Sequence, residues 1–289
     1  MNVGIGLPAT IPNTPPELIV EWAKRADIAG FSSLGIIDRL VYPNFEPMMT
    51  LAAVSSVTRQ VRLMTTVLVA PLRNAAILAK EAATLDKLSG GRLTLGFGIG
   101  GREDDSKAAG ITHRRRARRF EQQLNLMRKA WSQQPIGEHV GTIGPPPVQP
   151  GGPEVLIGGY TPTAASRAGR LGDGFIGGGG INAETALNLY KVAKGSWEAA
   201  GRKKKLRFVC SAYFALGENS AQKGAAYIRD YYGFMGPRVD GLVNSILSTP
   251  NSLNDAIRAY KDVGVHEVIL WPTIAELEQV ELASQFLKK

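Results

Sequence analysis

The sequence contains very little cysteine and histidine. Among its 289 residues there are one cysteine, Cys210, and three histidines, His113, His139 and His266. A single cysteine excludes an intramolecular disulfide and a cysteine-based zinc site. Because the histidines are far apart and no His-x-x-x-His spacing occurs, we expect no metal site. Cys210 falls in the middle of an apolar run, where a small core side chain is the expected role.

Long apolar runs are also missing. No run approaches the ~18 residues that a membrane-spanning helix requires. Residues 3–7 read as a strand directly after Met1, without a basic leader segment. Hydrophobic residues make up 44% of the chain and charged residues 20%, which excludes a disordered chain. We therefore expect a soluble, cytoplasmic protein without a membrane partner.

Basic residues outnumber acidic ones. The 34 Lys and Arg against 25 Asp and Glu give a net charge of +9, which permits an anionic partner. Part of the excess is local, in the arginine run of residues 114–119 and in the basic run of residues 202–205. The carboxylates of residues 103–105 and of Glu121 are expected to compensate the arginine run. No aromatic interleaving or binding motif accompanies it, so we expect no nucleic-acid partner.

Short apolar segments alternate with segments of helical period throughout the chain. Eight runs read as strands, at residues 3–7, 33–37, 61–69, 93–98, 155–157, 174–176, 206–215 and 268–271. Helices are expected at about residues 14–30, 47–58, 74–88, 114–133, 162–171, 184–200, 252–263 and 275–287. Thr14 and Thr273, each followed three residues later by Glu, predict capping boxes at the first and last helices.

Repeated strand–helix units specify a parallel sheet. At this length the economical closure is one α/β domain over residues 1–289, a (β/α)8 TIM barrel, whose active site is built from the loops that follow the strands. The segment after strand 7, residues 218–250, far exceeds the usual length of about two to six residues. It therefore predicts a lid-like insertion before the return helix.

The insertion is rich in aromatic residues, which suit covering a flat or apolar ligand. The alternative is that these rings pack a small core of the insertion itself. The aromatic residues are Tyr227, Tyr231, Tyr232 and Phe234.

Three polar residues at the expected active face are candidates for catalysis. Asp38 and Arg39 end strand 2, and charges that end an apolar strand are rarely buried without a use. Their alternative role is a salt bridge with each other or with a neighbour. His113 follows strand 4 and is the histidine placed at this face, whereas His266 precedes strand 8 on the opposite face and is expected to be structural.

The best candidate for an anion site follows strand 5. Residues 158–162 read Gly-Gly-Tyr-Thr-Pro, in which two glycines allow close backbone approach, Thr161 is a good N-cap and proline starts a helix. Free N–H groups at this helix start would point at a phosphate. The glycines of residues 177–180 form a rival site. Arg102, after strand 4, is placed to pair with the same phosphate from across the barrel mouth.

Several segments carry a family resemblance. Residues 61–67 read Val-Arg-Leu-Met-Thr-Thr-Val, and residues 79–93 read Ala-Lys-Glu-Ala-Ala-Thr-Leu-Asp-Lys-Leu-Ser-Gly-Gly-Arg-Leu, which is highly specific. The match continues at residues 96–98 (Gly-Phe-Gly), 167–170 (Arg-Ala-Gly-Arg) and 172–174 (Gly-Asp-Gly). The chain thus resembles the luciferase-like flavin-dependent oxidoreductases over most of its first 180 residues. Beyond them the likeness is mainly one of strand–helix order.

The resemblance implies a barrel that holds FMN, or the deazaflavin coenzyme F420, at its C-terminal face. In this family the coenzyme ring packs against a bulge in strand 3 that often holds a non-prolyl cis peptide, which maps to Thr66-Val67. The family's phosphate site maps to the segment after strand 5, in agreement with the anion site above. The positions implied for coenzyme binding are Thr65, Thr66, Val67, Gly98, Arg102, Gly158, Gly159, Tyr160 and Thr161.

One departure concerns the end of strand 2, where several members have a catalytic histidine and this sequence has Asp38-Arg39. Because the coenzyme carries the redox chemistry, the missing histidine does not exclude activity. The resemblance implies a monooxygenase that uses reduced FMN and O2 on a small organic substrate. It also implies a flavin reductase as partner and a homodimer as the assembly.

Two alternatives to the FMN-dependent monooxygenase stay open, although the wider use of FMN in the superfamily favours that enzyme. The first is an F420-dependent hydride-transfer enzyme, which is favoured by the net charge of +9 because a basic protein suits the polyglutamate tail of that coenzyme. A non-catalytic flavin-binding protein of the same fold is permitted by the departure at Asp38-Arg39.

Overall fold

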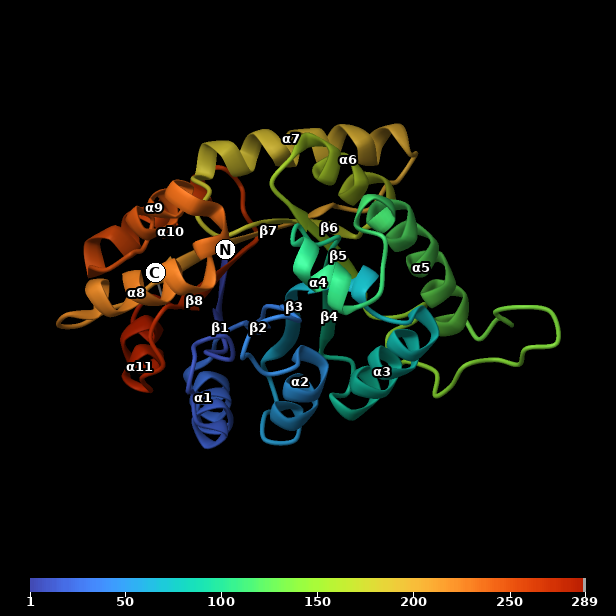
Figure 1. Ribbon diagram of the computed structural model, residues 1–289, viewed down its shortest axis with the longest axis horizontal. Coiled ribbons are helices and arrows are strands. Elements are labelled where there is room, and N and C mark those ends of the chain that lie inside the picture. The colour runs from blue at the N-terminus through green and yellow to red at the C-terminus, as the bar shows by residue number, and fades with distance from the viewer. Residues whose placement is uncertain (288–289) are drawn as a thin grey trace.

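The computed structural model describes residues 1–287, in which eight parallel strands form a closed barrel (Figure 1). Neighbouring strands pair in chain order, and the last strand closes the ring on the first, with Val3 opposite Val268. The predicted TIM barrel and its eight strands are confirmed. The strands are β1 (Asn2–Gly6), β2 (Ser33–Ile36), β3 (Arg62–Val69), β4 (Leu93–Gly98), β5 (Glu154–Gly159), β6 (Gly174–Gly177), β7 (Arg207–Phe214) and β8 (Glu267–Pro272).

Helices surround the barrel (Figure 1). No helix within residues 1–287 is both long and apolar enough to cross a membrane. The α-helices are α1 (Pro16–Ala29), α2 (Pro47–Ser55), α3 (Ala75–Leu88), α4 (Glu103–Ala108), α5 (Arg116–Trp131), α6 (Pro162–Leu171), α7 (Ala183–Ala199), α8 (Ser220–Tyr231), α9 (Val239–Asn244), α10 (Pro250–Asp262) and α11 (Glu278–Ser284). The 3₁₀ turns are η1 (Ala70–Leu72), η2 (His113–Arg115) and η3 (Gly233–Arg238).

Both predicted capping boxes are wrong. The N-cap of α1 is Pro15, and the hydroxyl of Thr14 instead donates to the carbonyl of Ile11 at 2.7 Å. The hydroxyl of Thr273 donates to the carbonyl of Phe214 on β7 at 3.1 Å, so it fastens two strand ends. In each case the helix begins further along the chain, with Pro15 and Leu277 at the N-cap positions, so neither threonine is placed to cap a helix.

Charged residues close the amino-terminal end of the barrel. Arg207 on β7 forms ion pairs with Glu154 on β5 and with Glu267 on β8. The hydroxyl of Ser33 on β2 donates to Glu267 at 2.6 Å. Because this network joins four strands in the barrel interior, it fixes the end of the barrel that serves stability. The opposite end is left for ligands.

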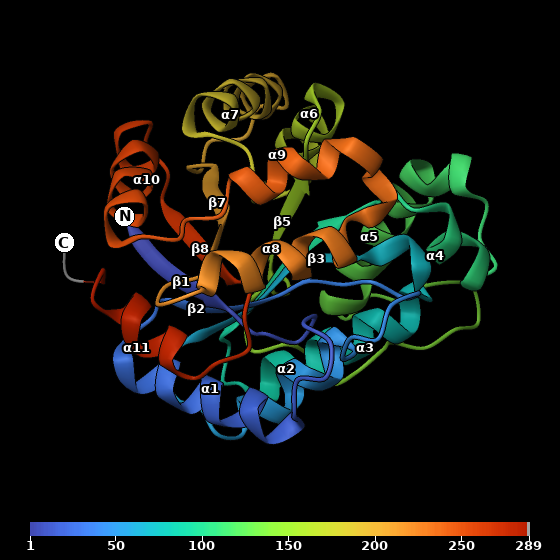
Figure 2. The ribbon, with the colours of Figure 1, turned by 60° about the vertical axis from the view of Figure 1, so that its left-hand side comes forward.

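The predicted insertion lies over the carboxyl ends of the strands. It contains α8, η3 and α9, and Figure 2 shows α8 and α9 lying across the barrel in front of β3 and β5. Tyr227 and Tyr231 of α8 pack in one apolar cluster with the barrel residues Met64, Ile269 and Trp271. For Tyr227 and Tyr231 the alternative of a separate small core is therefore wrong, because their rings pack into the core of the barrel.

Candidate functional site

The carboxyl ends of the strands and the loops that follow them form one surface, which we call the barrel mouth. Parallel strands place these ends side by side although they are distant in the sequence. The mouth includes residues 38–39 after β2, the bulge in β3, residues 98–102 after β4 and residues 158–161 after β5. The site residues predicted from the sequence lie on these segments, apart from His113 on the longer loop after β4.

The bulge in β3 has the expected backbone. The peptide bond Thr66-Val67 is cis, and the pairing of β3 with β4 shifts register between Thr66 and Leu68. The side chain of Val67 fills the space beside two glycines: a Cβ on Gly98 would lie 2.6 Å from its Cγ2, and one on Gly158 2.7 Å from its Cγ1. Glycine is therefore required at both positions while Val67 keeps this place.

Thr65 and Thr66 anchor the bulge. The hydroxyl of Thr65 donates to the carbonyl of Gly96 on β4 at 2.8 Å. The hydroxyl of Thr66 donates to the carbonyl of Ile36 on β2 at 3.4 Å. Both side chains are buried, so they hold β3 to its two neighbours and leave Val67 as the half-buried residue of the bulge.

The turn from β5 into α6 presents an exposed helix N-terminus. The Thr161 side chain is the N-cap of α6 and accepts a hydrogen bond from the Ala164 amide at 3.3 Å. A Cβ on Gly159 would lie 2.3 Å from the Cβ of Ala164, so only glycine allows this tight turn. The ring of Tyr160 lies on the backbone of Gly178, and its hydroxyl donates to the Gly179 carbonyl at 3.4 Å. The two glycine-rich loops therefore lie together.

Asp38 is engaged by Arg73. Its Oδ2 lies 2.5 Å from Arg73 Nη1 and accepts the Val69 amide at 2.8 Å. Arg73 also contacts Glu46, with 2.9 Å between Nη2 and Oε1. Burial opposes the charged guanidinium, but the hydrogen bonds and negative charges of Asp38 and Glu46 together outweigh it and raise the pKa of Arg73. Sequence reasoning missed Arg73 as a site residue, although it stands two residues after Pro71 at the end of β3.

Arg39 points into the insertion. Its Nη1 donates to the carbonyl of Tyr231 at 2.8 Å. Its guanidinium lies 4.5 Å from the ring centroid of Tyr42 and 5.9 Å from that of Phe234. The structure thus gives the two neighbouring residues Asp38 and Arg39 different partners, and they form no salt bridge with each other.

Arg102 and His113 belong to the loop that follows β4. Arg102 forms an ion pair with Asp104, and its guanidinium lies 4.3 Å from the ring centroid of Phe234. His113 Nδ1 lies 2.8 Å from the hydroxyl oxygen of Ser106 in the same loop. Phe234 therefore lies against the guanidinium groups of both Arg39 and Arg102, which joins the insertion to two loops of the mouth.

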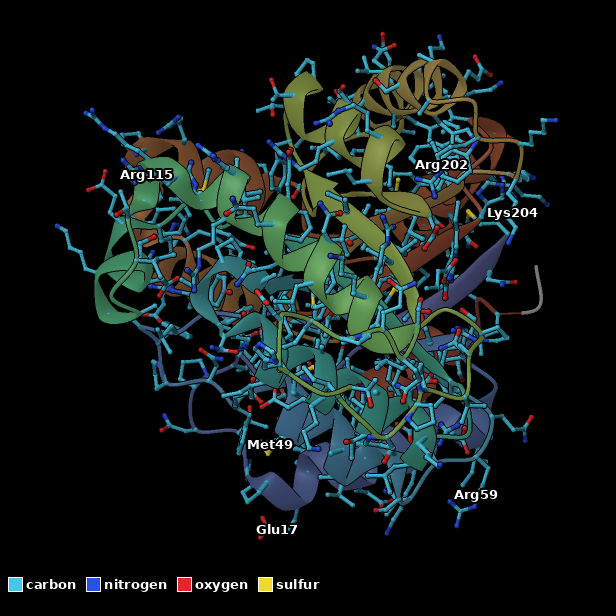
Figure 3. The ribbon with its side chains drawn as sticks, turned by 90° about the vertical axis from the view of Figure 1, so that its right-hand side faces the viewer. Glu17, Met49, Arg59, Arg115, Arg202 and Lys204 are labelled. Atoms are coloured by element: carbon cyan, nitrogen blue, oxygen red, sulfur yellow. The ribbon has the colours of Figure 1, made fainter. Side chains whose placement is uncertain are left out.

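The arginine run lies beside this loop. Arg116 Nε donates to the carbonyl of Gly100 at 2.8 Å, and Arg119 Nε to the carbonyl of Pro71 at 2.9 Å. The side chains of the other three arginines are exposed and form no ion pair or hydrogen bond within residues 1–287; Figure 3 shows one of them at the outer edge of the molecule. They are Arg114, Arg115 and Arg118.

The expected compensation of the arginine run by nearby carboxylates is wrong. Glu121 contacts Arg167 at 3.3 Å and Arg170 at 3.2 Å instead. Asp104 is bound by Arg102, and Asp105 accepts the backbone amides of residues 40 and 41. The unpaired positive charge of the run therefore persists at the edge of the mouth.

The second basic run lies at the other end of the barrel, before β7. Arg202 forms an ion pair with Asp173 at 3.1 Å and lies 3.8 Å from the ring centroid of Trp197. Figure 3 shows Arg202 and Lys204 far from Arg115. The two basic runs therefore do not form one surface.

Tyrosines fill the mouth beneath the insertion. The hydroxyls of Tyr213 and Tyr232 are hydrogen-bonded to each other, and those of Thr10 and Tyr227 lie 2.7 Å apart. Burial raises the pKa of Tyr213 and of Tyr231 well above the usual range. These phenols therefore stay protonated near neutral pH.

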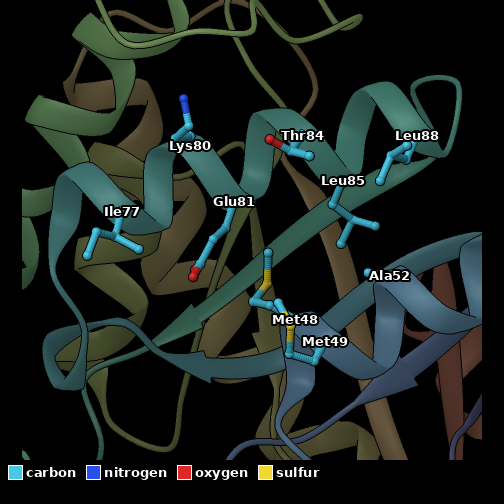
Figure 4. Close-up of a pocket in the computed structure, with 9 residues that line it drawn as sticks. All are labelled: Met48, Met49, Ala52, Ile77, Lys80, Glu81, Thr84, Leu85 and Leu88. Atoms are coloured by element: carbon cyan, nitrogen blue, oxygen red, sulfur yellow. The ribbon is translucent and has the colours of Figure 1, made fainter.

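An apolar groove of about 300 Å³ lies outside the barrel, between α2 and α3 (Figure 4). Met48 and Met49 of α2 and Ile77 and Leu88 of α3 line it. Met49, Ile77 and Leu88 are each more than half exposed. This face is separate from the barrel mouth.

No group of three or more metal-ligating side chains occurs within residues 1–287.

Sequence comparison identifies relatives. The sequence model of the luciferase-like monooxygenase family matches residues 1–269. The protein of Kribbella flavida named F420-dependent glucose-6-phosphate dehydrogenase is 31% identical over 223 residues, which cover 70% of this chain and 65% of that protein. An uncharacterised protein of Mycobacterium tuberculosis is 29% identical over 187 residues, 55% of this chain and 64% of its own length. The chain thus spans about two thirds of the length of these curated relatives.

Solved structures share the fold. The monooxygenase RslO1 from Streptomyces bottropensis superposes with a TM-score of 0.78 at 23% identity, covering 99% of this chain and 97% of that chain. An F420-dependent secondary alcohol dehydrogenase in complex with an F420-acetone adduct gives 0.82 at 17% identity, covering 98% and 97%. At these identities the likeness shows the fold alone. The family match extends over nearly the whole sequence, so this chain belongs to the luciferase-like monooxygenase family of oxidoreductases.

Proposed function

We propose that this chain uses coenzyme F420, bound at the barrel mouth, for hydride transfer to or from a small organic substrate. The observation that carries the proposal is the unpaired charge of Arg114, Arg115 and Arg118 beside the loop after β4. A polyglutamate tail suits such a surface, whereas FMN has no tail to reach it. The Kribbella flavida relative is named F420-dependent, which supports the same choice.

The residues of the mouth fit a ring with a phosphate side chain. Val67, held beside Gly98 and Gly158, offers an apolar platform for one face of the ring. The turn at Gly159 leaves one amide of the first turn of α6, that of Thr163, free for a phosphate, because Pro162 has no N–H and the Ala164 amide donates to Thr161. We propose that these residues and Tyr160 hold the coenzyme, with Arg102 near the phosphate once it leaves Asp104.

The coenzyme, the polar residues Asp38 and His113 and the insertion have separate roles in this proposal. When bound, F420 supplies the hydride chemistry. The pair of Asp38 and Arg73 holds the ends of β2 and β3 in place, and the contact of His113 with Ser106 orders the loop after β4. We therefore propose that Asp38 and His113 position the mouth rather than touch the substrate. The insertion excludes water from the ring.

A second candidate is the FMN-dependent monooxygenase. The turn after β5 favours it equally, because the same free amide and helix N-terminus fit the terminal phosphate of FMN. That enzyme would need O2 and reduced FMN from a reductase. A protein that binds flavin without catalysis is the third outcome that an experiment must separate.

A fluorescence titration with F420 and with FMN, at low and moderate salt, tests the proposal. We expect tighter binding of F420, weakened by salt because the tail contact is between exposed charges. A substrate that donates a hydride should then bleach the F420 absorbance. Tighter FMN binding together with reductase-dependent O2 uptake would support the second candidate. Tight binding without turnover would indicate a binding protein, and binding of neither coenzyme would refute all three.

The apolar groove supports a further part of the proposal, a homodimer. Exposed apolar side chains on α2 and α3 are typical of a surface that is covered in the assembly. The charged side chain of Glu81 points from α3 toward Met48 in this groove (Figure 4), and a symmetric contact would bring the same surface of a second copy against it. Sedimentation of the wild type and of Ile77→Asp tests this part. A wild-type monomer, or a variant dimer as stable as the wild type, would contradict it.

A further inference from the structure

Arg39 has unfilled hydrogen-bond donors within the mouth. Nη1 donates to the Tyr231 carbonyl, but Nε is buried without a partner, and Nη2 makes no hydrogen bond within residues 1–287. These two N–H groups lie on the same edge of the planar guanidinium and point in parallel. Nε and Nη2 can therefore donate two parallel hydrogen bonds to one ligand group; we call this pair of donors the fork of Arg39. Buried donors without partners are rare in folded proteins and call for an explanation.

No carboxylate within residues 1–287 forms an ion pair with Arg39. A guanidinium that is partly withdrawn from water is unfavourable without a counter-ion, and the aromatic rings around it compensate only in part. The carboxylates of the neighbouring elements are engaged elsewhere: Asp38 by Arg73, Asp104 by Arg102, Asp105 by the amides of Leu40 and Val41, and Asp230 by Tyr42. The positive charge of Arg39 thus remains for a ligand.

We propose that Arg39 binds the oxyanion group of the substrate, so that the substrate is a small acid carrying a carboxylate or a phosphate. The proposal rests on the oxidoreductase function above and adds the class of substrate. A planar guanidinium edge matches two oxygens of such a group with two parallel, charge-assisted hydrogen bonds. A neutral alcohol or ketone would leave the fork unfilled.

Phe234 controls access to this fork. Its ring lies 5.9 Å from the guanidinium of Arg39 and 4.3 Å from that of Arg102, and 56% of the residue is exposed. An entering oxyanion displaces the ring and replaces a cation–π contact by a stronger ion pair. Because Arg102 belongs to the loop after β4, the bound acid would lie next to the proposed coenzyme site.

Calorimetric titrations with simple acids test the proposal. The probes are benzoate and phenyl phosphate, and benzamide is the uncharged control of similar shape. Each is titrated into the full chain with and without saturating F420. The variants are Arg39→Met, which removes the charge, Arg39→Lys, which keeps the charge but loses the fork, and Arg258→Met, a matched control on the outer face of α10.

We expect the acids to bind the wild type and the Arg258→Met variant equally. Binding should weaken by about tenfold in Arg39→Lys and by more in Arg39→Met, while benzamide fails to bind. If all variants bind phenyl phosphate more tightly than benzoate and with the same affinity as the wild type, the phosphate binds at the α6 turn and Arg39 is not its site. Equal binding of benzoate by wild type and Arg39→Met, or of benzamide and benzoate, would overturn the proposal. So would loss of benzoate binding on adding F420, because Arg39 would then belong to the coenzyme.

A measurement on the wild type alone guards against misfolded variants. Phenylglyoxal modifies accessible guanidinium groups, and peptide mass spectrometry reports its reaction at Arg39. Benzoate should slow modification at Arg39 and leave Arg258 unchanged. No protection of Arg39 would overturn the anion site. Since these titrations also run without coenzyme, they can succeed where F420 binding fails, which separates the two proposals.

Discussion

Asp38 and Arg73 form a bidentate ion pair, with 2.5 Å between Oδ2 and Nη1 and 3.1 Å between Oδ1 and Nη2. The Asp38 side chain is 2% exposed and that of Arg73 is 19% exposed. Because Asp38 also accepts the Val69 amide at 2.8 Å, it joins the end of β2 to the end of β3 directly beneath the proposed coenzyme site.

Replacing Asp38 by Asn should destabilise the fold. It leaves a largely buried guanidinium without its main counter-ion, which typically costs about 3–5 kcal/mol. Residual exposure and the contact of Arg73 with Glu46 reduce this, so we expect a loss of about 2–3 kcal/mol. Urea unfolding followed by circular dichroism measures it, with Asp255→Asn on exposed α10 as the control. Equal stability of the two variants would contradict the prediction.

A negative charge at the start of α6 should weaken binding of the phosphate-bearing coenzyme. Thr163 is exposed in the first turn, so Thr163→Glu places a carboxylate where we propose the phosphate. We expect about tenfold weaker binding of F420 or FMN, with riboflavin unaffected. Thr185→Glu, in the first turn of α7, is the matched control. Equal losses for FMN and riboflavin would mean that the phosphate lies elsewhere.

Removing the unpaired arginines should weaken binding of the F420 tail and leave binding of the deazaflavin ring unchanged. In the triple variant of Arg114, Arg115 and Arg118 to Gln, the affinity for F420 should fall and depend less on salt. The affinity for the deazaflavin without phosphate and tail should stay the same. Fluorescence titrations at two salt concentrations measure both ligands. A wild-type salt dependence in the variant would show that the tail binds another surface.

His266 should make stability depend on mildly acidic pH. Its Nδ1 accepts the Phe208 amide at 2.8 Å, and burial, together with Lys205 and Arg207, lowers its pKa. Below about pH 6.5 the unfolded chain therefore takes up a proton that the folded chain resists, so the free energy of unfolding falls as pH falls.

We expect the free energy of unfolding to fall between roughly pH 7 and 5.5, measured by urea unfolding. His266→Gln should have a shallower dependence than the wild type over this range. His139→Gln, a change of an exposed histidine, should keep the wild-type dependence. A wild-type slope in His266→Gln would assign the effect to other groups.

The hydrogen bond between Thr10 and Tyr227 should hold the insertion closed. Both side chains are buried, and Tyr227→Phe leaves the Thr10 hydroxyl unsatisfied at a cost of about 1–3 kcal/mol. We expect faster proteolysis within residues 218–250 and better access of iodide to bound coenzyme. Tyr190→Phe removes a comparable hydrogen bond, to Leu206 on the outside of the barrel, and should change neither. If both variants behave alike, the insertion is not fastened by Tyr227.

The periodicity of the sequence predicted the strands well because a parallel barrel needs apolar runs separated by amphipathic helices. The capping patterns at Thr14 and Thr273 misled because the helices begin further along the chain, with Pro15 and Leu277 at the N-cap positions. The sequence also assigned the carboxylates around the arginine run to the wrong partners. Charges close in sequence compete with partners from other strands.

The sequence by itself determined the barrel, the position of the insertion, the cis peptide at Thr66-Val67 through the family resemblance, and the glycine-rich turn at residues 158–161. These features depend on local pattern and on motifs that are contiguous in the chain. Only the tertiary structure decided that Asp38 binds Arg73 and that Arg39 keeps an unfilled donor edge beneath the insertion. Such pairings join residues from different strands, and their geometry arises only when the barrel closes.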